Sequence, residues 1–289
     1  MKKDNSFYDN LEDRKKKELE HHNTHREIVT GYEYDTDAYG KTEEERRKYV
    51  TDQEEYEYHF SNAKFYSITN SSFAYRDKIL FKDMENKIAL DWCCGNGEIG
   101  LAMAQAGAKK VCGVDLSDVS INNATKLAKE NNVGEKCNYQ QMDAENMSYA
   151  DNTFDVVHEY GALHHVDLEV SLKEVSRVLK PEGRFICTEA LRHNPLIHAY
   201  RKRSMHLRTQ WEVDHILGVQ DILKGKKYFN NVNIKYFHLF ALAAIPFRKT
   251  FIFKPLLSVL ELLDNVFLKI PFVQRMAWVA VIEYSQPKL

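Results

Sequence analysis

The sequence predicts an α/β protein built on a doubly wound, mostly parallel sheet. Apolar runs alternate with helical patterns between residues 86 and 190, which is typical of strands joined by crossover helices. In chain order, strands are expected at "KIALDW", "KVCGVDL", "NYQQMD", "FDVVHEYGAL" and "RFICTEAL". Helices are expected from about residue 98, over "VSINNATKLAKENN" and over "LEVSLKEVSRVLK".

Two further strands are expected after this alternating region. They are "VNIKYFHLF" and "AWVAVIEY", whose β-branched and aromatic residues favour strands. The residues between them predict a helical insertion. These strands would extend the sheet at one edge and include a late antiparallel strand.

Composition excludes several classes of protein. Hydrophobic residues make up 44% of the 289-residue chain, enough for a full core. Forty basic and 42 acidic side chains give a formal charge of -2, so no overall field attracts nucleic acid, and no nucleic-acid partner is expected. Five cysteines without a C-x-x-C pair fit neither a disulfide framework nor a zinc site. We therefore expect a reducing, cytoplasmic location and no metal.

The segment "ALDWCCGNGEIG" contains a glycine-rich turn directly after the first expected strand. Gly95, Gly97 and Gly100 fit G-x-G-x-x-G, so a dinucleotide such as NAD is one candidate ligand. Asp115 ends the second strand 20 residues after Gly95 (115 − 95), where a carboxylate accepts ribose hydroxyls. However, Asp91 and Glu98 would repel a pyrophosphate at this turn. Two carboxylates instead favour a ligand with a ribose and a cationic ammonium or sulfonium group.

These residues resemble the motifs of class I S-adenosylmethionine-dependent methyltransferases, in particular the type-11-like methyltransferase domain with its Rossmann-like sheet. "LDWCCGNG" is similar to the first motif, hydrophobic-D-x-G-x-G-x-G, except that Cys93 stands in place of the first glycine. "GVDLSDVSINNA" and "QMDAENMSYADNTFDVV" are similar to the next motifs, and "ALHHV" and "EVSRVLKPEGRF" to the later segments. The resemblance covers about residues 60 to 190.

The resemblance implies S-adenosylmethionine as the cofactor, and it assigns positions to each part of that molecule. Asp91, Cys93, Gly95 and Gly97 would line the methionine portion, and Asp115 would hold the ribose hydroxyls. Adenine would pack on Leu116 and be read by Asp143 and the Ala144 backbone. His158 and Glu159 would close the site near the sulfonium.

Acceptor and catalytic candidates follow the fourth and fifth strands. His164 and His165 match the "LHH" of the resembling family; they either shape the helix start or, with Glu189, act as a general base for a hydroxyl acceptor. The expected acceptor contacts are Tyr160, Arg192, His193 and Asn194. A basic group is either a solvated helix surface or a site for an anionic acceptor group: Arg201, Lys202, Arg203 and Arg208.

We expect a helical N-terminal extension over residues 1–60, with a tyrosine-rich lid, and one methyltransferase domain over residues 61–289. The candidate lid residues are Tyr56, Tyr58, Tyr66 and Tyr75. Within the domain, residues 86–190 form the cofactor-binding core. Residues 191–275 hold the acceptor-recognition segment and the helical insertion, and residues 277–284 form the final strand.

The apolar segment 241–275 is interrupted by charges, which argues against a membrane span. It either lies on a membrane surface, lines a channel for a lipophilic substrate, packs on the sheet or joins two copies of the chain. The main hypothesis is methyl transfer to oxygen, nitrogen or carbon of a small acceptor, lipophilic or anionic. The alternatives are an NAD-dependent oxidoreductase and a non-catalytic cofactor-binding or membrane-peripheral protein.

Overall fold

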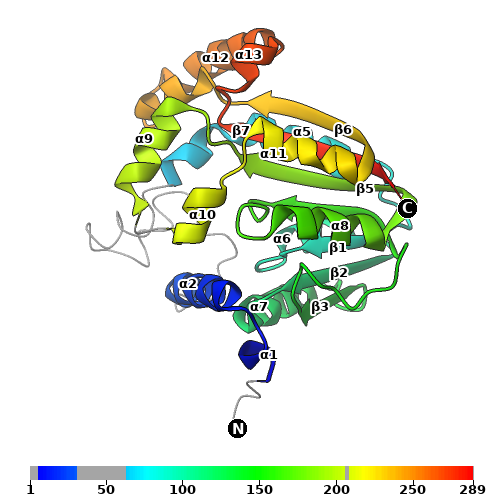
Figure 1. Cartoon of the computed structure of the whole chain (residues 1–289). Helices are drawn as coiled ribbons and strands as arrows, with labels where there is room; N and C mark the ends of the chain where they lie inside the picture. Colours follow the sequence, from blue (N-terminus) through cyan, green and yellow to red (C-terminus); the bar gives the residue numbers. More distant parts are fainter. Residues whose placement is uncertain (1–5, 31–62, 206–207, 289) are drawn as a thin grey trace.

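A seven-stranded sheet forms the centre of the computed structural model, which describes residues 6–30, 63–205 and 208–288 (Figure 1). The strand order is β3-β2-β1-β4-β5-β7-β6. Only β7 runs antiparallel to its neighbours, β5 and β6, which confirms the predicted late antiparallel strand. The strands are β1 (Ile88–Trp92), β2 (Lys110–Asp115), β3 (Cys137–Gln141), β4 (Phe154–Tyr160), β5 (Leu179–Ala190), β6 (Phe229–Phe237) and β7 (Val279–Pro287).

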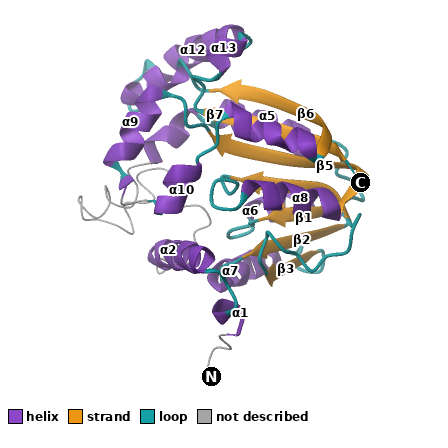
Figure 2. Cartoon of the chain, viewed as in Figure 1, coloured by secondary structure: helices purple, strands orange, loops and turns teal. Residues whose placement is uncertain are grey.

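Helices cover both faces of this sheet, as a doubly wound fold requires (Figure 2). Ala89 of β1 belongs to a core cluster on one face, and its neighbour Leu90 belongs to a cluster on the other. Because successive side chains of a strand point to opposite faces, this alternation buries β1 on both sides. The first face is covered by α5 (Asn70–Leu80), α6 (Glu98–Gln105) and α7 (Asp118–Glu130), and the second by α8 (Leu168–Val178) and α11 (Val219–Leu223).

Side-chain caps set where several helices begin. Ser117 accepts the Ser120 N–H at the start of α7, and Asp167 accepts two backbone N–H groups at the start of α8. Asn194 caps α9 in the same way. These caps place α7 and α8 immediately after the strand ends that are expected to hold the ligand. The other elements between β5 and β6 are α9 (Pro195–Arg203), α10 (Gln210–His215) and the 3-10 turn η3 (Lys224–Lys227).

The N-terminal extension is helical where the structure describes it. It contains α1 (Ser6–Asp9) and α2 (Asp13–Thr30), and α2 lies beside α7 (Figure 1). The rest of the extension expected over residues 1–60 lies outside the described residues. The 3-10 turn η1 (Ala63–Ile68) then leads into α5.

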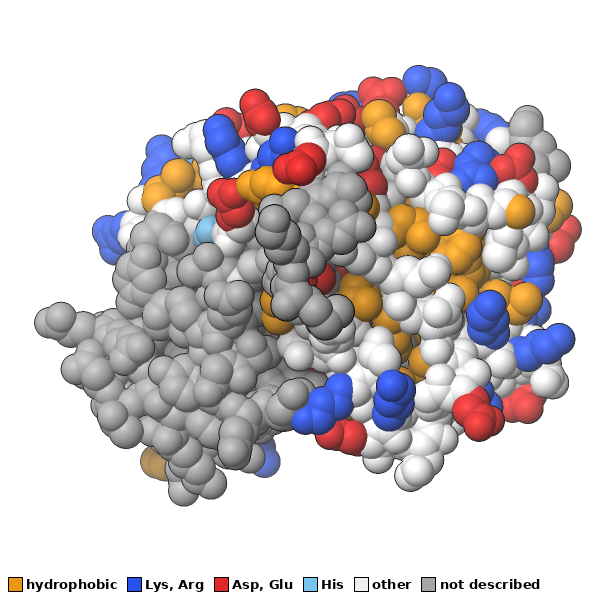
Figure 3. Space-filling model, turned by 90° about the horizontal axis from the view of Figure 1, so that it is seen from below, with side chains coloured by type: hydrophobic (Ala, Val, Ile, Leu, Met, Phe, Trp, Pro, Cys, Tyr) orange, Lys and Arg blue, Asp and Glu red, His pale blue; other side chains and the backbone are white. Residues whose placement is uncertain are grey.

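The predicted helical insertion between the last two strands is confirmed. It consists of η4 (Ala241–Phe247), α12 (Phe253–Phe267) and α13 (Pro271–Gln274). Figure 1 shows α12 and α13 together at one end of the molecule, far from α1 and α2. On the face seen in Figure 3, basic and acidic side chains are interspersed among the described residues.

Candidate functional site

Three left-handed residues shape the turn between β1 and α6. Cys93, Gly95 and Gly97 have φ angles of 55°, 53° and 86°. At Gly97 a Cβ would lie 2.6 Å from the Ala124 Cβ, so this position requires glycine both for its backbone angle and for its packing against α7. The left-handed φ of Cys93 explains why the resembling family has glycine there, since a side chain in that conformation carries a steric cost.

Asp91, at the end of β1, uses its carboxylate inside the fold. Its Oδ2 accepts the Gly100 N–H at 2.9 Å, and its Oδ1 lies 3.1 Å from His158 Nδ1. Burial lowers the pKa of His158, so the ring is neutral and donates its Nδ1–H to Asp91. His158 Nε2 is buried and has no hydrogen-bond partner among the described residues. Asp91 therefore fixes both the glycine turn and the orientation of His158.

Asp115 and Asp143 follow neighbouring strands, β2 and β3. Asp115 accepts the Gly95 N–H at 3.0 Å and the Ser117 N–H at 2.9 Å, which orients its carboxylate at the glycine turn. Asp143 accepts the Glu145 N–H at 2.9 Å through its Oδ1. The sheet order brings both carboxylates to the same edge as Cys93, the arrangement expected for ribose and adenine recognition.

The backbone around these carboxylates is also held. Leu116 is half-buried, and its carbonyl accepts Gln141 Nε2 at 2.8 Å. Ala144 is buried, and its carbonyl accepts Trp92 Nε1 at 3.0 Å. Both residues thus lie in ordered turns directly after β2 and β3.

Helix α2 reaches over this edge and pairs with its acidic side chains. Lys15 Nζ lies 2.6 Å from Asp143 Oδ2 and 2.8 Å from Glu145 Oε2. Arg14 donates to both oxygens of Glu145, at 2.7 and 2.9 Å. Glu18 lies 2.8 Å from His165 Nδ1. Although burial opposes the charged imidazole, this hydrogen bond and the negative charges nearby raise the pKa of His165, so the pair fastens α2 as an ion pair.

The turn lies in strongly acidic surroundings. Burial raises the pKa of the Cys93 thiol well above its ordinary value, and the charges of Asp115 and Glu159 raise it further. The thiol therefore stays neutral. Such surroundings favour a cationic ligand and oppose a pyrophosphate, which counts against the NAD alternative.

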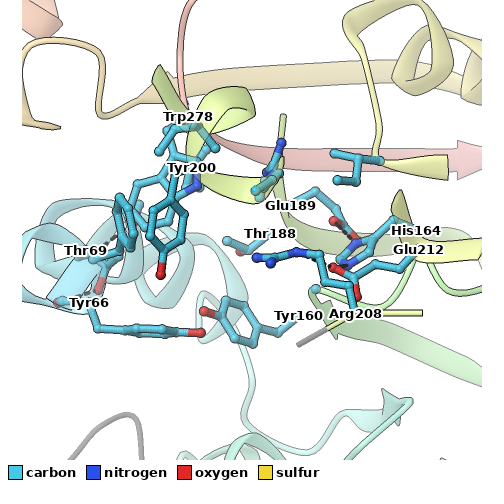
Figure 4. Close-up of a pocket in the computed structure, with 18 of the residues that line it drawn as sticks. Tyr66, Thr69, Tyr160, His164, Thr188, Glu189, Tyr200, Arg208, Glu212 and Trp278 are labelled. Atoms are coloured by element: carbon cyan, nitrogen blue, oxygen red, sulfur yellow. Dashed lines mark hydrogen bonds and ion pairs between the residues drawn. The ribbon is translucent and has the colours of Figure 1, made fainter. Parts of the chain in front are cut away.

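A cavity of about 260 Å³ opens at the carboxyl ends of β4 and β5 (Figure 4). Tyr160 and Gly161 contribute from β4 and the turn after it, and Thr188 and Glu189 from β5. Aromatic side chains form much of the wall: Phe65, Tyr66, Phe73, Tyr160, Tyr200 and Trp278. Figure 4 shows Tyr66 and Tyr160 pointing toward each other, with Arg208 reaching in from the side of Glu212.

Glu189 and His164 form a buried pair at the polar side of the cavity. Glu189 Oε2 lies 2.7 Å from His164 Nδ1, and Glu189 Oε1 accepts the Leu163 N–H at 2.7 Å. Burial lowers the pKa of His164 to about 3, so the imidazole is neutral. With Nδ1–H donated to Glu189, its Nε2 carries the lone pair and lies 3.9 Å from Glu212 Oε1, beyond hydrogen-bond distance. Burial also raises the pKa of Glu189. Burial and the negative charge of Glu189 together raise the pKa of Glu159.

Two arginines of the basic segment line the same cavity. Arg201 donates to the Leu191 carbonyl at 2.9 Å, and burial together with the charge of Arg208 lowers its pKa to about 10. Arg208 Nε lies 3.1 Å from Glu212 Oε1. The hydroxyls of Thr188 and Tyr200 are buried without a hydrogen-bond partner among the described residues. The cavity thus combines aromatic walls with several polar groups that a ligand can satisfy.

Other acceptor candidates lie away from this cavity. Arg192 forms an ion pair with Asp221 at 2.6 Å, Asn194 caps α9, and neither residue lines the cavity. His193 packs near Gly218 and does not line it either. His165 contacts α2 instead.

The two described tyrosines of the expected lid lie in different places. Tyr66 lines the cavity, whereas Tyr75 packs against Phe237. Tyr56 and Tyr58 lie outside the described residues. No local sequence pattern points to Phe65, Tyr200, Glu212 or Trp278 as cavity residues, because they come together from distant segments.

Residues 90–187 match the methyltransferase domain family. The chain is 35% identical over 127 residues to demethylmenaquinone methyltransferase of Lactobacillus johnsonii, covering 42% of this chain and 52% of that protein. It is 35% identical over 96 residues to 27-O-demethylrifamycin SV methyltransferase of Amycolatopsis mediterranei, covering 33% of this chain and 35% of that protein. The chain thus spans about half or less of the length of these relatives.

A solved structure of geranyl diphosphate methyltransferase, in complex with GPP and sinefungin, shares the fold. Its TM-score is 0.53 at 15% identity, over 75% of this chain and 78% of that chain. The sheet order and the glycine turn are those expected for the family that residues 90–187 match. Residues 90–187 therefore form a methyltransferase domain of the class I, S-adenosylmethionine-dependent type.

Proposed function

We propose that the protein transfers a methyl group from S-adenosylmethionine to a small lipophilic acceptor that also carries a polar group. One observation carries this proposal: β4, whose end lines the aromatic cavity, is the direct neighbour of β1, whose end carries the glycine turn. A ligand on the turn and a ligand in the cavity would therefore meet at adjoining strand ends. The relatives named for demethylmenaquinone and 27-O-demethylrifamycin SV support a lipophilic acceptor.

The residues around the turn fit the proposed cofactor. Asp115 is oriented at the turn by two backbone N–H groups, and a carboxylate is the group that accepts hydrogen bonds from ribose hydroxyls. Leu116, Asp143 and Ala144 would surround the adenine. At the other end of the cofactor, Gly95 and Gly97 would let the methionine portion lie close to the backbone. The acidic surroundings of Cys93 would favour the positive charge of that portion. When bound, the cofactor supplies a methyl group on a positively charged sulfur.

In this proposal the chain contributes positioning, exclusion of water and a proton acceptor. Phe73, Tyr160 and Tyr200 would hold the apolar body of the acceptor, and Arg208 a polar or anionic group. Holding the nucleophile in line with the methyl carbon contributes roughly 7–11 kcal/mol of barrier reduction. The cofactor, held by the glycine turn and Asp115, would supply the methyl group, and its sulfur would keep the electron pair of the broken bond.

We assign the proton acceptor to the pair of His164 and Glu189. His164 Nε2 would take the proton that the acceptor hydroxyl or amine loses, and Glu189 would stabilise the resulting imidazolium through Nδ1. We do not assign that role to His165, because its Nδ1 faces Glu18.

Calorimetric titration with S-adenosylmethionine tests the cofactor, with NAD as the comparison ligand. Asp115→Asn keeps the shape of the side chain but removes its charge, and the loss of charged hydrogen bonds predicts about 10- to 150-fold weaker binding. Transfer of a labelled methyl group to lipophilic phenols and amines then tests the reaction. Preferential binding of NAD would contradict the proposal, and cofactor binding without transfer to any acceptor would favour the non-catalytic alternative.

A further inference from the structure

The insertion carries a concentrated apolar surface. Of the 14 large hydrophobic side chains that are exposed among the described residues, ten lie between residues 247 and 272. Phe251 is 94% exposed, Phe272 is 74% exposed and Leu262 is 64% exposed. The set, called here the outer apolar surface, consists of Phe247, Phe251, Ile252, Val259, Leu262, Leu263, Val266, Phe267, Ile270 and Phe272.

Helix α12 has one apolar stripe turned inward and a second turned outward. Phe253, Leu256, Leu257 and Leu260 are partly buried and pack against the core cluster around η4. The outward stripe recurs at i, i+3, i+4, i+7 and i+8, which is one continuous helix face. It consists of Val259, Leu262, Leu263, Val266 and Phe267. Packing on the domain therefore accounts for only the inner stripe.

Charges around this surface are mostly basic. Residues 241–275 contain five basic side chains and two acidic ones, although the whole chain has a formal charge of -2. One of the acids, Asp264, is buried and accepts backbone N–H groups of Leu239 and Phe240. The basic residues are Arg248, Lys249, Lys254, Lys269 and Arg275.

We infer that the outer apolar surface docks on the surface of an anionic lipid bilayer. Exposed aromatic and aliphatic side chains beside lysine and arginine are the features of helices that lie in a membrane interface. None of the helices in the described part of the chain has the length and apolarity needed to cross a bilayer. A symmetric contact between two copies would bring the same basic residues together, which opposes dimerisation through this surface.

The inner side of the insertion connects this surface to the cavity. Phe65, Ile197 and Trp278 line the cavity and belong to the same cluster as the inward stripe of α12. If the proposed function holds, docking would place this wall of the acceptor cavity next to the lipid. A lipophilic acceptor would then have a short path from the bilayer. The docking itself does not depend on the transfer reaction.

Vesicle flotation of the full chain tests the docking without any activity measurement. Vesicles of phosphatidylcholine alone are compared with vesicles that also contain phosphatidylglycerol. We expect binding that requires the anionic lipid. The triple variant Phe251→Ser/Leu262→Ser/Phe272→Ser should lose it, and Lys254→Glu/Lys269→Glu should weaken it at least about tenfold, since each basic residue contributes to lipid attraction.

The control is Val170→Ser, which replaces an exposed apolar residue on α8 and should bind vesicles like the unmodified chain. Circular dichroism establishes that each variant is folded, which is expected because the altered side chains are exposed. Absence of binding to both vesicles would overturn the inference, as would binding that the triple variant retains. Sedimentation that shows a dimer dissociated by the triple variant would instead assign this surface to a second copy.

Discussion

Replacing Glu189 by Gln tests the proposed proton acceptor with little change in side-chain shape. Glu189 Oε1 accepts the Leu163 N–H, and Oε2 faces His164 Nδ1, both at 2.7 Å. A glutamine keeps the first bond through its carbonyl oxygen and turns its NH₂ group toward Nδ1. Nδ1 must then accept, which places the ring proton on Nε2 and removes the lone pair there.

The expected loss of rate follows from this change of tautomer. A positioned general base contributes about 100- to 10,000-fold to the rate of a proton-coupled step, which corresponds to roughly 2.7–5.5 kcal/mol of the barrier. We expect single-turnover methyl transfer to an alcohol to fall by this factor in Glu189→Gln. Cofactor binding should be retained, because the proposed cofactor contacts are made by other side chains.

The same substitution changes how folding stability depends on pH. Burial raises the pKa of Glu189 above its ordinary value of 4.5, so the folded protein holds this proton more tightly than the unfolded chain. The resulting stability is fully present below 4.5 and is lost as the pH rises through the higher folded-state pKa. Glu189→Gln stays neutral, so its unfolding free energy should decrease less over that interval in urea titrations.

Single-turnover assays with saturating cofactor compare Glu189→Gln, His164→Gln and His165→Gln. The first two should be slow, and His165→Gln serves as the matched histidine control because His165 does not line the cavity. If Glu189→Gln and His164→Gln transferred the methyl group as fast as the unmodified protein, the reasoning about this pair would be refuted.

Three further substitutions probe the turn, α2 and the cavity. Gly97→Ala should lower the free energy of unfolding in urea by roughly 2–5 kcal/mol, because Gly97 has a left-handed φ and an added Cβ would lie 2.6 Å from Ala124. Gly134→Ala is the control: Gly134 has no left-handed φ, and the change in stability should be less than about 1 kcal/mol. Lys15→Met should speed proteolysis within α2 and weaken cofactor binding, because Lys15 ties α2 to Asp143 and Glu145; unchanged values would contradict this role of Lys15. Arg208→Gln should raise KM about 10- to 150-fold for a carboxylate-bearing acceptor but not for its neutral analogue; equal effects on both would count against an anion contact.

The centre of the sheet was predictable from sequence because β1, β2 and β4 are buried on both faces. The apolar runs around Leu90 and Val111 are local patterns that predict β1 and β2. The glycine turn after β1 is a local pattern too, and it predicts the start of α6. The position of β7 between β5 and β6 was predictable only as an addition at the sheet edge. Its exact neighbours depend on packing between distant segments.

The cavity was only partly predictable for the same physical reason. His164 and Glu189 follow strand ends, so the rule that ligands bind at strand ends finds them. Arg192 and Asn194 also follow β5, but an ion pair with Asp221 and the cap of α9 occupy their side chains. Lys15 meets Asp143 across 128 residues of sequence, a pairing that no local pattern reveals.

The distribution of charge along the site leads to a last prediction. At the proposed adenine end, Arg14 and Lys15 already neutralise Asp143 and Glu145. At the other end, burial and the negative charge of Glu189 raise the pKa of Glu159 well above its ordinary value, so Glu159 retains its proton. A bound sulfonium and ammonium would favour the ionised form of Glu159 and lower this pKa.

Cofactor binding at neutral pH should therefore release protons. Calorimetry in buffers of different ionisation enthalpy measures this release directly, and it should be smaller in Glu159→Gln, which lacks the titrating carboxyl. An observed enthalpy that is independent of the buffer would mean that Glu159 does not respond to the charge of the ligand. The cationic end of the cofactor would then have to lie away from Glu159, and its methyl group would lie away from the acceptor proposed to occupy the cavity.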